Sequence, residues 1–154
     1  MELQLPRWKQ LPEIALYMDQ VQLVLGGILE PLTTQEGPMV TPTMINNYVK
    51  MKLTPPAEKK KYGREHLAMF LMICLLKKAL SMTELAALKQ RLLENSNLET
   101  AYDQFCGELE LRLRSLDGPD SDDCPPVLAA AVRGVACKIR VEQLLGEQQG
   151  ADGT

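Results

Sequence analysis

Residues 40–67 read V-T-P-T-M-I-N-N-Y-V-K-M-K-L-T-P-P-A-E-K-K-K-Y-G-R-E-H-L, and they open the stretch from Val40 to Leu92 that organises the chain. Thr41 is suited to the N-cap position, where its hydroxyl accepts a hydrogen bond from a free backbone N–H. Pro42 is suited to the first helical position, which needs no N–H. These two residues predict a short helix from Pro42 to about Met51.

This short helix is predicted to have two different faces. Ile45, Tyr48 and Val49 recur at the spacing of one helical face, which indicates burial of that face. The opposite face is polar and cationic, and it carries Thr43, Asn46, Asn47 and Lys50.

A break and a basic loop follow this helix. Pro55 and Pro56 prevent the helix from continuing, and a new helix is expected to begin near Arg64. Between them lies the lysine run 59–61. A short amphipathic helix, a break and a basic loop are typical of a DNA-reading unit, although a lysine run by itself is equally well interpreted as a solvated turn.

The same residues resemble two known families. N-N-Y-V-K-M-K-L-T-P-P followed by K-K-Y-G-R-E-H-L resembles the recognition helix and wing of the MerR-type winged helix-turn-helix. The span from L-P-R-W, at residues 5–8, to K-K-Y-G-R-E-H-L resembles a bacterial family known as domain of unknown function 1836. Asn46-Asn47-Tyr48 stands where the MerR pattern has Arg-Tyr-Tyr, Lys52 stands where it has Gly, and the wing is very short.

The first resemblance implies contacts with double-stranded DNA. Asparagine amides bond bidentately to adenine edges, and lysines and arginines neutralise phosphates. The base-reading residues are then expected to be Thr43, Asn46, Asn47 and Lys50. The phosphate-binding residues are expected to be Lys52, Lys59, Lys60, Lys61 and Arg64.

Charge is unevenly distributed along the chain. Its formal net charge is −3, yet residues 41–64 carry six cations against one acid, which gives +5. Residues 93–154 carry five cations against twelve acids, which gives −7. A basic element of this kind suits contact with phosphates, whereas the acidic remainder is expected to face away from them.

Composition and motifs exclude several other classes of function. The four cysteines are too widely spaced for a C-x-x-C pair, and His66 is the single histidine, so neither a zinc site nor a disulfide framework is indicated. No motif of an enzyme or cofactor site is visible, so we expect no catalytic residue, metal or cofactor. The longest apolar run, residues 67–76, is too short to span a membrane, and the N-terminus lacks a secretion-signal pattern, so a cytoplasmic location is expected.

The remaining periodicity predicts further helices and an all-α class. An extended arm is expected over residues 1–11, and helices are expected over 13–29, 64–78, from Ser81, from Asn97 to about 116, and from 126 to about 145. These elements suggest a winged helix-turn-helix-like head at 1–93, a helical extension at 94–146 and a flexible tail at 147–154. The predicted core includes Leu67, Phe70, Leu71, Cys74, Leu85 and Leu88.

The sequence therefore predicts a sequence-specific DNA-binding transcriptional regulator of MerR-like type. The alternative is a non-enzymatic protein–protein interaction module that uses the same polar and basic face. Apolar stripes on the last two helices suggest a homodimer, or closure of the monomer's own core. By analogy with MerR proteins, a bundle pocket near Tyr102 and Phe105 is a conceivable effector site.

Overall fold

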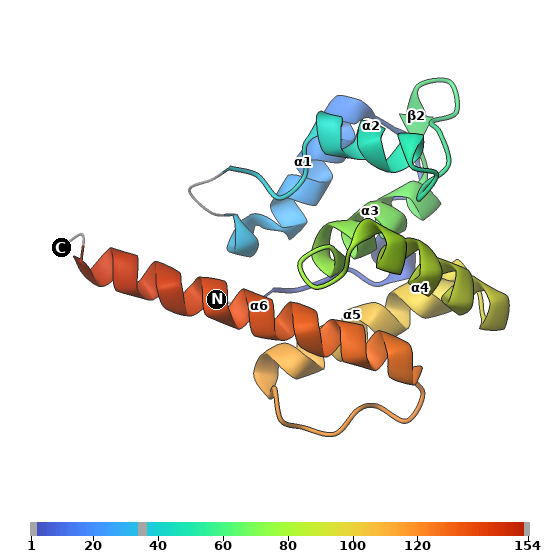
Figure 1. The fold of residues 1–154 in the computed structure, drawn as a ribbon. Coiled ribbons are helices and arrows are strands. Elements are labelled where there is room, and N and C mark those ends of the chain that lie inside the picture. The colour runs from blue at the N-terminus through green and yellow to red at the C-terminus, as the bar shows by residue number, and fades with distance from the viewer. Residues whose placement is uncertain (1–2, 34–36, 153–154) are drawn as a thin grey trace.

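The computed structural model describes the backbone of residues 3–33 and 37–152, and side chains as far as residue 146. Six α-helices carry most of these residues, and the one sheet found among them has two short strands. The predicted all-α class is therefore confirmed. Figure 1 shows α2 (Pro42–Lys50) at one end of the molecule and α5 (Leu98–Arg114) with α6 (Pro126–Asp152) at the other.

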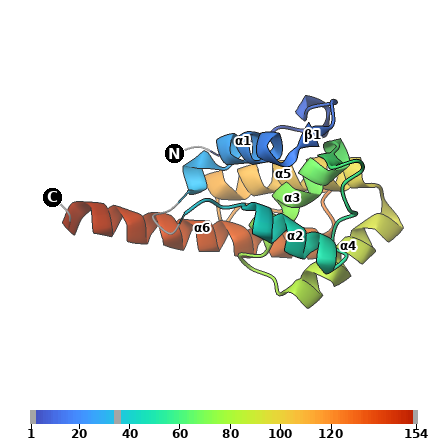
Figure 2. The same cartoon turned by 90° about the horizontal axis from the view of Figure 1, so that it is seen from above.

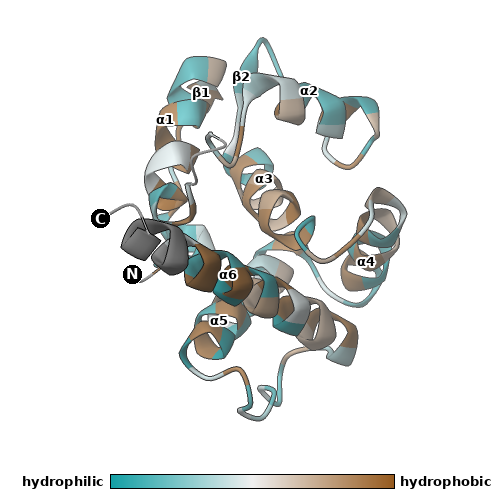
Figure 3. Ribbon diagram, turned by 60° about the vertical axis from the view of Figure 1, so that its left-hand side comes forward, coloured by the Kyte–Doolittle hydropathy of each residue, from teal (hydrophilic) through white to brown (hydrophobic). Residues whose placement is uncertain are grey.

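Helix α3 (Arg64–Leu76) lies at the centre of the fold. Every residue from His66 to Leu76 is buried, because the helix packs against α1 (Met18–Ile28) on one side and against α5 and α6 on the other. Figure 3 shows that this helix is largely apolar after its polar first turn. All six predicted core residues are buried: Leu67, Phe70, Leu71, Cys74, Leu85 and Leu88.

Three helix starts that the sequence predicts are formed by side-chain caps. The Thr41 hydroxyl accepts the Met44 N–H at 3.2 Å at the start of α2. Ser81 and Glu84 form a capping box at the start of α4 (Met82–Asn95). Asn97 accepts the Thr100 N–H at 2.8 Å at the start of α5. Each cap satisfies a backbone donor that the helix itself leaves unpaired.

The first predicted helix is shorter than expected. It was predicted over residues 13–29, but α1 begins at Met18, because Leu16 and Tyr17 form strand β1 instead. Strand β1 pairs antiparallel with β2 (Lys61–Tyr62), with Leu16 opposite Tyr62 and Tyr17 opposite Lys61. Tyr17 is 50% exposed. Backbone pairing with a distant strand has overridden the local helical pattern.

The last helix is longer than expected. The sequence predicted its end near Leu145 and a flexible tail at 147–154, but α6 continues to Asp152, and residues 153–154 lie outside the described part. No proline interrupts this segment, and the glycines within it weaken a helix without stopping it. Figures 1 and 2 both show α6 projecting beyond the other helices.

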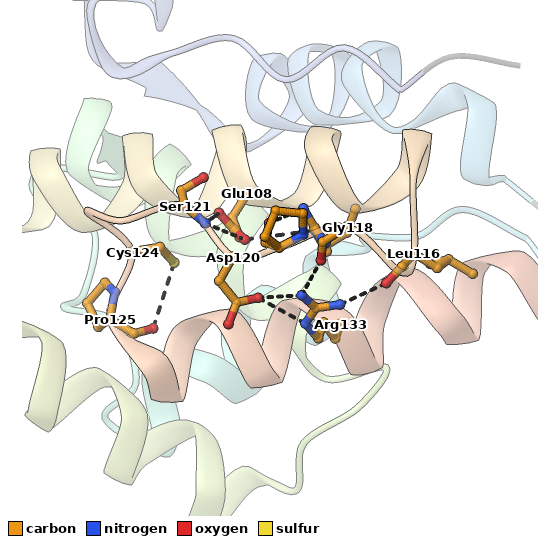
Figure 4. A network of polar contacts seen from close by, with 10 residues as sticks. Glu108, Leu116, Gly118, Asp120, Ser121, Cys124, Pro125 and Arg133 are labelled. Atoms are coloured by element: carbon orange, nitrogen blue, oxygen red, sulfur yellow. Dashed lines mark hydrogen bonds and ion pairs between the residues drawn. The ribbon is translucent and has the colours of Figure 1, made fainter.

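An irregular loop at residues 115–125 connects α5 to α6, and two arginines hold it. The Arg133 guanidinium donates to the carbonyl oxygens of Leu116 at 2.8 Å and Gly118 at 2.5 Å, and it pairs with Asp120 at 2.6 Å (Figure 4). The buried Arg112 donates to the carbonyls of Gly118 and Pro119. Both guanidiniums thereby satisfy backbone acceptors that this irregular segment leaves unpaired.

The N-terminal arm packs on α5, and a short 3₁₀-helix (Trp8–Gln10) lies within it. The Trp8 N–H donates to Asp103 at 2.8 Å, and the Tyr102 hydroxyl donates to the Pro6 carbonyl at 2.7 Å. Arg7 pairs with Glu110 at 2.9 Å. The arm and α5, about 100 positions apart in the chain, therefore form one packed unit.

Candidate functional site

The outer face of α2 is the first part of the candidate site. Ile45 and Tyr48 are buried against the body of the protein, and the Lys77 ammonium lies 5.8 Å from the centroid of the Tyr48 ring. The opposite face is open to solvent, as the predicted amphipathic pattern requires. All four residues predicted to read bases are exposed on it: Thr43, Asn46, Asn47 and Lys50.

The segment that follows α2, residues 52–60, is here called the lysine loop. Lys52 begins it at a φ of 61°, the left-handed conformation that usually favours glycine. Its N–H donates to the Val49 carbonyl, and the Leu53 N–H donates to the Tyr48 carbonyl, both at 3.0 Å. These two bonds form the glycine-type C-cap of α2 with lysine in the glycine position.

The lysine loop ends in a two-residue hairpin. The N–H of Glu58 donates to the Lys61 carbonyl at 3.0 Å, and the Lys61 N–H donates to the Glu58 carbonyl at 2.9 Å. Lys59 and Lys60 form the turn between them, at φ values of 51° and 67°. Turns with both central residues at positive φ strongly prefer Asn-Gly or Gly-Gly. Lys59 and Lys60 therefore adopt a backbone conformation that is unfavourable for lysine, and their side chains are exposed.

Two side chains from the body of the protein hold the base of the lysine loop. The Lys89 ammonium on α4 donates to the Leu53 carbonyl at 2.8 Å, and burial lowers the pKa of this ammonium. The His66 ring joins the loop to α3, because its Nε2 bonds the Pro56 carbonyl at 3.1 Å and its Nδ1 accepts the Gly63 N–H at 3.0 Å. These roles require a neutral imidazole protonated on Nε2.

The last two predicted phosphate-binding residues, Lys61 and Arg64, contact other parts of the protein. The Lys61 ammonium lies 5.0 Å from the centroid of the Tyr17 ring, on the paired strand β1. The Arg64 guanidinium donates to the Leu11 carbonyl at 2.9 Å and lies 3.5 Å from a carboxylate oxygen of Glu13. Lys61 and Arg64 thus hold the strands and the arm together, whereas Lys52, Lys59 and Lys60 are exposed.

The residues that position the lysines were not predicted from the sequence. No local pattern distinguishes Lys59 and Lys60 from other lysines. For Lys52 there was a signal, because it stands where the MerR pattern has glycine. The contacts of His66 and Lys89 join residues 10 and 36 positions apart, which periodicity does not detect. Tyr102 and Phe105, near which an effector pocket was suggested, are both fully buried in the core.

The described residues contain neither a cluster of metal ligands nor a helix suited to a membrane span. No group of three or more His, Cys, Asp or Glu side chains within this part of the chain is placed to hold a metal ion. Likewise, no helix in the described ranges combines the length and apolar character needed to cross a bilayer.

Comparison with known proteins identifies one family. The model of the family described as "domain of unknown function (DUF1836)" matches residues 6–105, about two-thirds of the chain. No curated protein and no solved structure matches the chain. The matched span runs from the N-terminal arm to Phe105, so it contains both partners of the contacts that Pro6 and Trp8 make with α5.

Proposed function

We propose that this chain, which belongs to the family of domain of unknown function DUF1836, is a sequence-specific DNA-binding transcriptional regulator. In this proposal α1 and α2 form a helix-turn-helix-like pair, and the lysine loop with β2 acts as a very short wing. The exposed face of α2 enters the major groove, where Asn46 and Asn47 read base edges. Thr43 and Lys50 flank them on the same face.

The separation of charge supports this proposal. The segment 41–64 carries a charge of +5, and it lies at the end of the molecule opposite α5 and α6, as Figure 1 shows. The acidic segment 93–154, with a charge of −7, supplies those two helices. DNA approaching the basic end meets an attractive field and stays away from the acidic end.

The observation that carries the proposal is the backbone conformation of Lys52, Lys59 and Lys60. A residue other than glycine at such a φ costs roughly 1–2 kcal/mol, and glycine or asparagine relieves most of that cost. Strain of this kind is typically retained at functional sites. Three lysines in such positions on one surface indicate that the cationic side chain is needed there, and phosphate binding gives a reason for the need.

The alternative is a protein–protein interaction module that uses the same face. An acidic partner also fits an exposed strip of lysines beside asparagine amides. The two proposals differ in what they require of duplex DNA. The regulator binds a preferred sequence, and the interaction module binds every duplex weakly.

Selection of bound sequences from a pool of random duplexes tests the proposed function. We expect one motif to be enriched. The enrichment should be lost on Asn47→Ala and retained on the control change Asn95→Ala at the far end of α4. If no motif is enriched and Lys59→Ala with Lys60→Ala leaves weak binding unchanged at low salt, the regulator proposal is wrong. The interaction module then becomes the better explanation.

A homodimer belongs to the same proposal. Val141, Leu144 and Leu145 are 45–54% exposed in the C-terminal half of α6. Their spacing of three and four residues forms one apolar strip, which suits pairing with the same strip of a second copy. Two copies related by a two-fold axis then present two α2 helices to two half-sites.

A further inference from the structure

A groove lies between the N-terminal arm, the end of α5 and the middle of α6, and no residue of the lysine loop lines it. Its volume is about 1060 Å³, at the upper end of the range of roughly 300–1,000 Å³ that small-molecule sites occupy. Leu3 and Leu113 contribute apolar surface to its wall. Arg114 and Arg140 line it as well, and both are exposed.

The charged side chains that line this groove carry a net positive charge. Arg7 and Glu110 pair at 2.9 Å, and the second Glu110 oxygen accepts the Leu5 N–H at 2.8 Å, so this carboxylate is already satisfied. The remaining charged side chains of the wall are Arg114, Arg140 and Asp117, which leaves one net positive charge. This charge is an exception within a segment whose total charge is −7.

The two groove arginines also differ from the other arginines nearby. Arg112 and Arg133 both hold the loop 115–125 through hydrogen bonds to its carbonyl oxygens, as Figure 4 shows for Arg133. Within the part of the chain that the structure describes, neither Arg114 nor Arg140 forms a hydrogen bond or an ion pair. Two guanidiniums therefore line one groove without a hydrogen bond to the described residues, and the charge of Arg114 also helps to lower the pKa of the Glu110 carboxyl.

We propose that this groove binds a small organic anion, a carboxylate or a phosphate monoester that carries a short aliphatic chain. Guanidinium groups match both oxyanions, because their paired N–H donors bond two oxygens at once. Arg114 and Arg140 would hold the anionic head, and the aliphatic chain would lie against Leu3 and Leu113. The proposal is independent of DNA binding, since no lysine of the 52–60 loop lines the groove.

Binding is tested with octanoate and hexyl phosphate as probes and with octanol as the uncharged control. We expect one or both anions to raise the thermal midpoint of the intact chain and octanol to leave it unchanged. The double change Arg114→Gln and Arg140→Gln should weaken binding roughly tenfold or more, since it removes charge-assisted hydrogen bonds. Arg91→Gln, an exposed arginine on α4, should leave it unchanged.

Amide chemical-shift mapping distinguishes binding in this groove from binding at the lysine loop, which also attracts anions. Shifts that cluster at residues 3–7 and 113–117 support the proposal. Three results would overturn it: no binding of either anion, equal binding by the double variant, or shifts confined to residues 50–61. Because no DNA is present, each result leaves the test of DNA binding untouched.

Discussion

The Nε2 of His66 lies 3.1 Å from the carbonyl oxygen of Pro56, so a buried ring on α3 fixes the chain just before the lysine hairpin. The same ring accepts the Gly63 N–H through Nδ1 on the other side of that hairpin. One side chain therefore holds both ends of the segment that presents Lys59 and Lys60. This arrangement makes the geometry of the hairpin depend on the core.

Replacing His66 with Ala should destabilise the protein by about 1–3 kcal/mol, because it leaves two backbone groups without partners and opens space beside Phe70. The ring centroids of His66 and Phe70 are 6.0 Å apart. Urea unfolding measures the effect, with the exposed neighbour Glu65→Ala as the matched control. Equal stability of the two variants would show that the ring does not hold the hairpin.

Replacing Lys52 with Gly should have opposite effects on stability and on DNA binding. Glycine adopts the φ of 61° without steric cost, so the free energy of unfolding should rise by up to about 1 kcal/mol. Loss of one phosphate contact should weaken binding to all duplexes and reduce the log-log salt slope by about one unit. Lys9→Ala on the arm serves as a control for the loss of one positive charge. A stabilised variant with unchanged DNA binding would remove Lys52 from the interface.

The hairpin offers a second test of the same idea. Changing Lys59 to Asn and Lys60 to Gly gives the turn the sequence that its backbone prefers, and it should stabilise the protein by about 1 kcal/mol. Two charges are lost, so the salt slope should fall by up to about two units. Thermal unfolding and fluorescence titration at several salt concentrations measure both quantities. A destabilised variant would contradict the strain argument, whatever its affinity for DNA.

Acid should weaken the contact between the N-terminal arm and α5. Burial tends to raise the pKa of the Glu110 carboxyl, but hydrogen bonds from Arg7 and the Leu5 N–H, together with the charges of Arg7 and Arg114, outweigh it and lower the pKa. A carboxyl whose folded pKa is lowered stabilises the protein above its unfolded pKa. That contribution is lost as the pH falls through the folded value.

Glu110→Gln should therefore destabilise the protein at neutral pH and have little further effect in strong acid. Urea unfolding at several pH values gives the difference between parent and variant. Asp122→Asn, an exposed change in the loop before α6, is the control and should be neutral throughout. A difference that stays constant with pH would mean that the Glu110 contact does not depend on its charge.

The proposed dimer should be visible by light scattering. We expect the parent chain to be dimeric at tens of micromolar and Leu144→Glu with Leu145→Glu to be monomeric, because charges on the apolar strip oppose its pairing. Leu23→Glu is the matched control, since Leu23 is 78% exposed on α1, away from the strip. A parent chain that is monomeric at this concentration would end the dimer proposal.

Local signals in the sequence were sufficient for most of the helices. Thr41, Ser81 and Asn97 each cap a helix within three residues of themselves, so the information needed to place those starts is contiguous. The apolar run 67–76 predicted a buried helix for the same reason, because burial on all sides needs no knowledge of the partners. The unequal distribution of charge is likewise a property of the chain alone.

Only the tertiary structure showed the strand pair, the positive φ values of the lysines and the groove. Leu16 and Tyr17 form a strand because Lys61 and Tyr62 lie beside them, and no local pattern encodes that pairing. The positive φ values of Lys52, Lys59 and Lys60 follow from the bonds that close the C-cap and the hairpin. The groove lined by Arg114 and Arg140 exists because the arm crosses α5 and α6. Long-range contacts set the strand pairing and the groove, whereas the C-cap and the hairpin are closed by bonds between residues three to five positions apart.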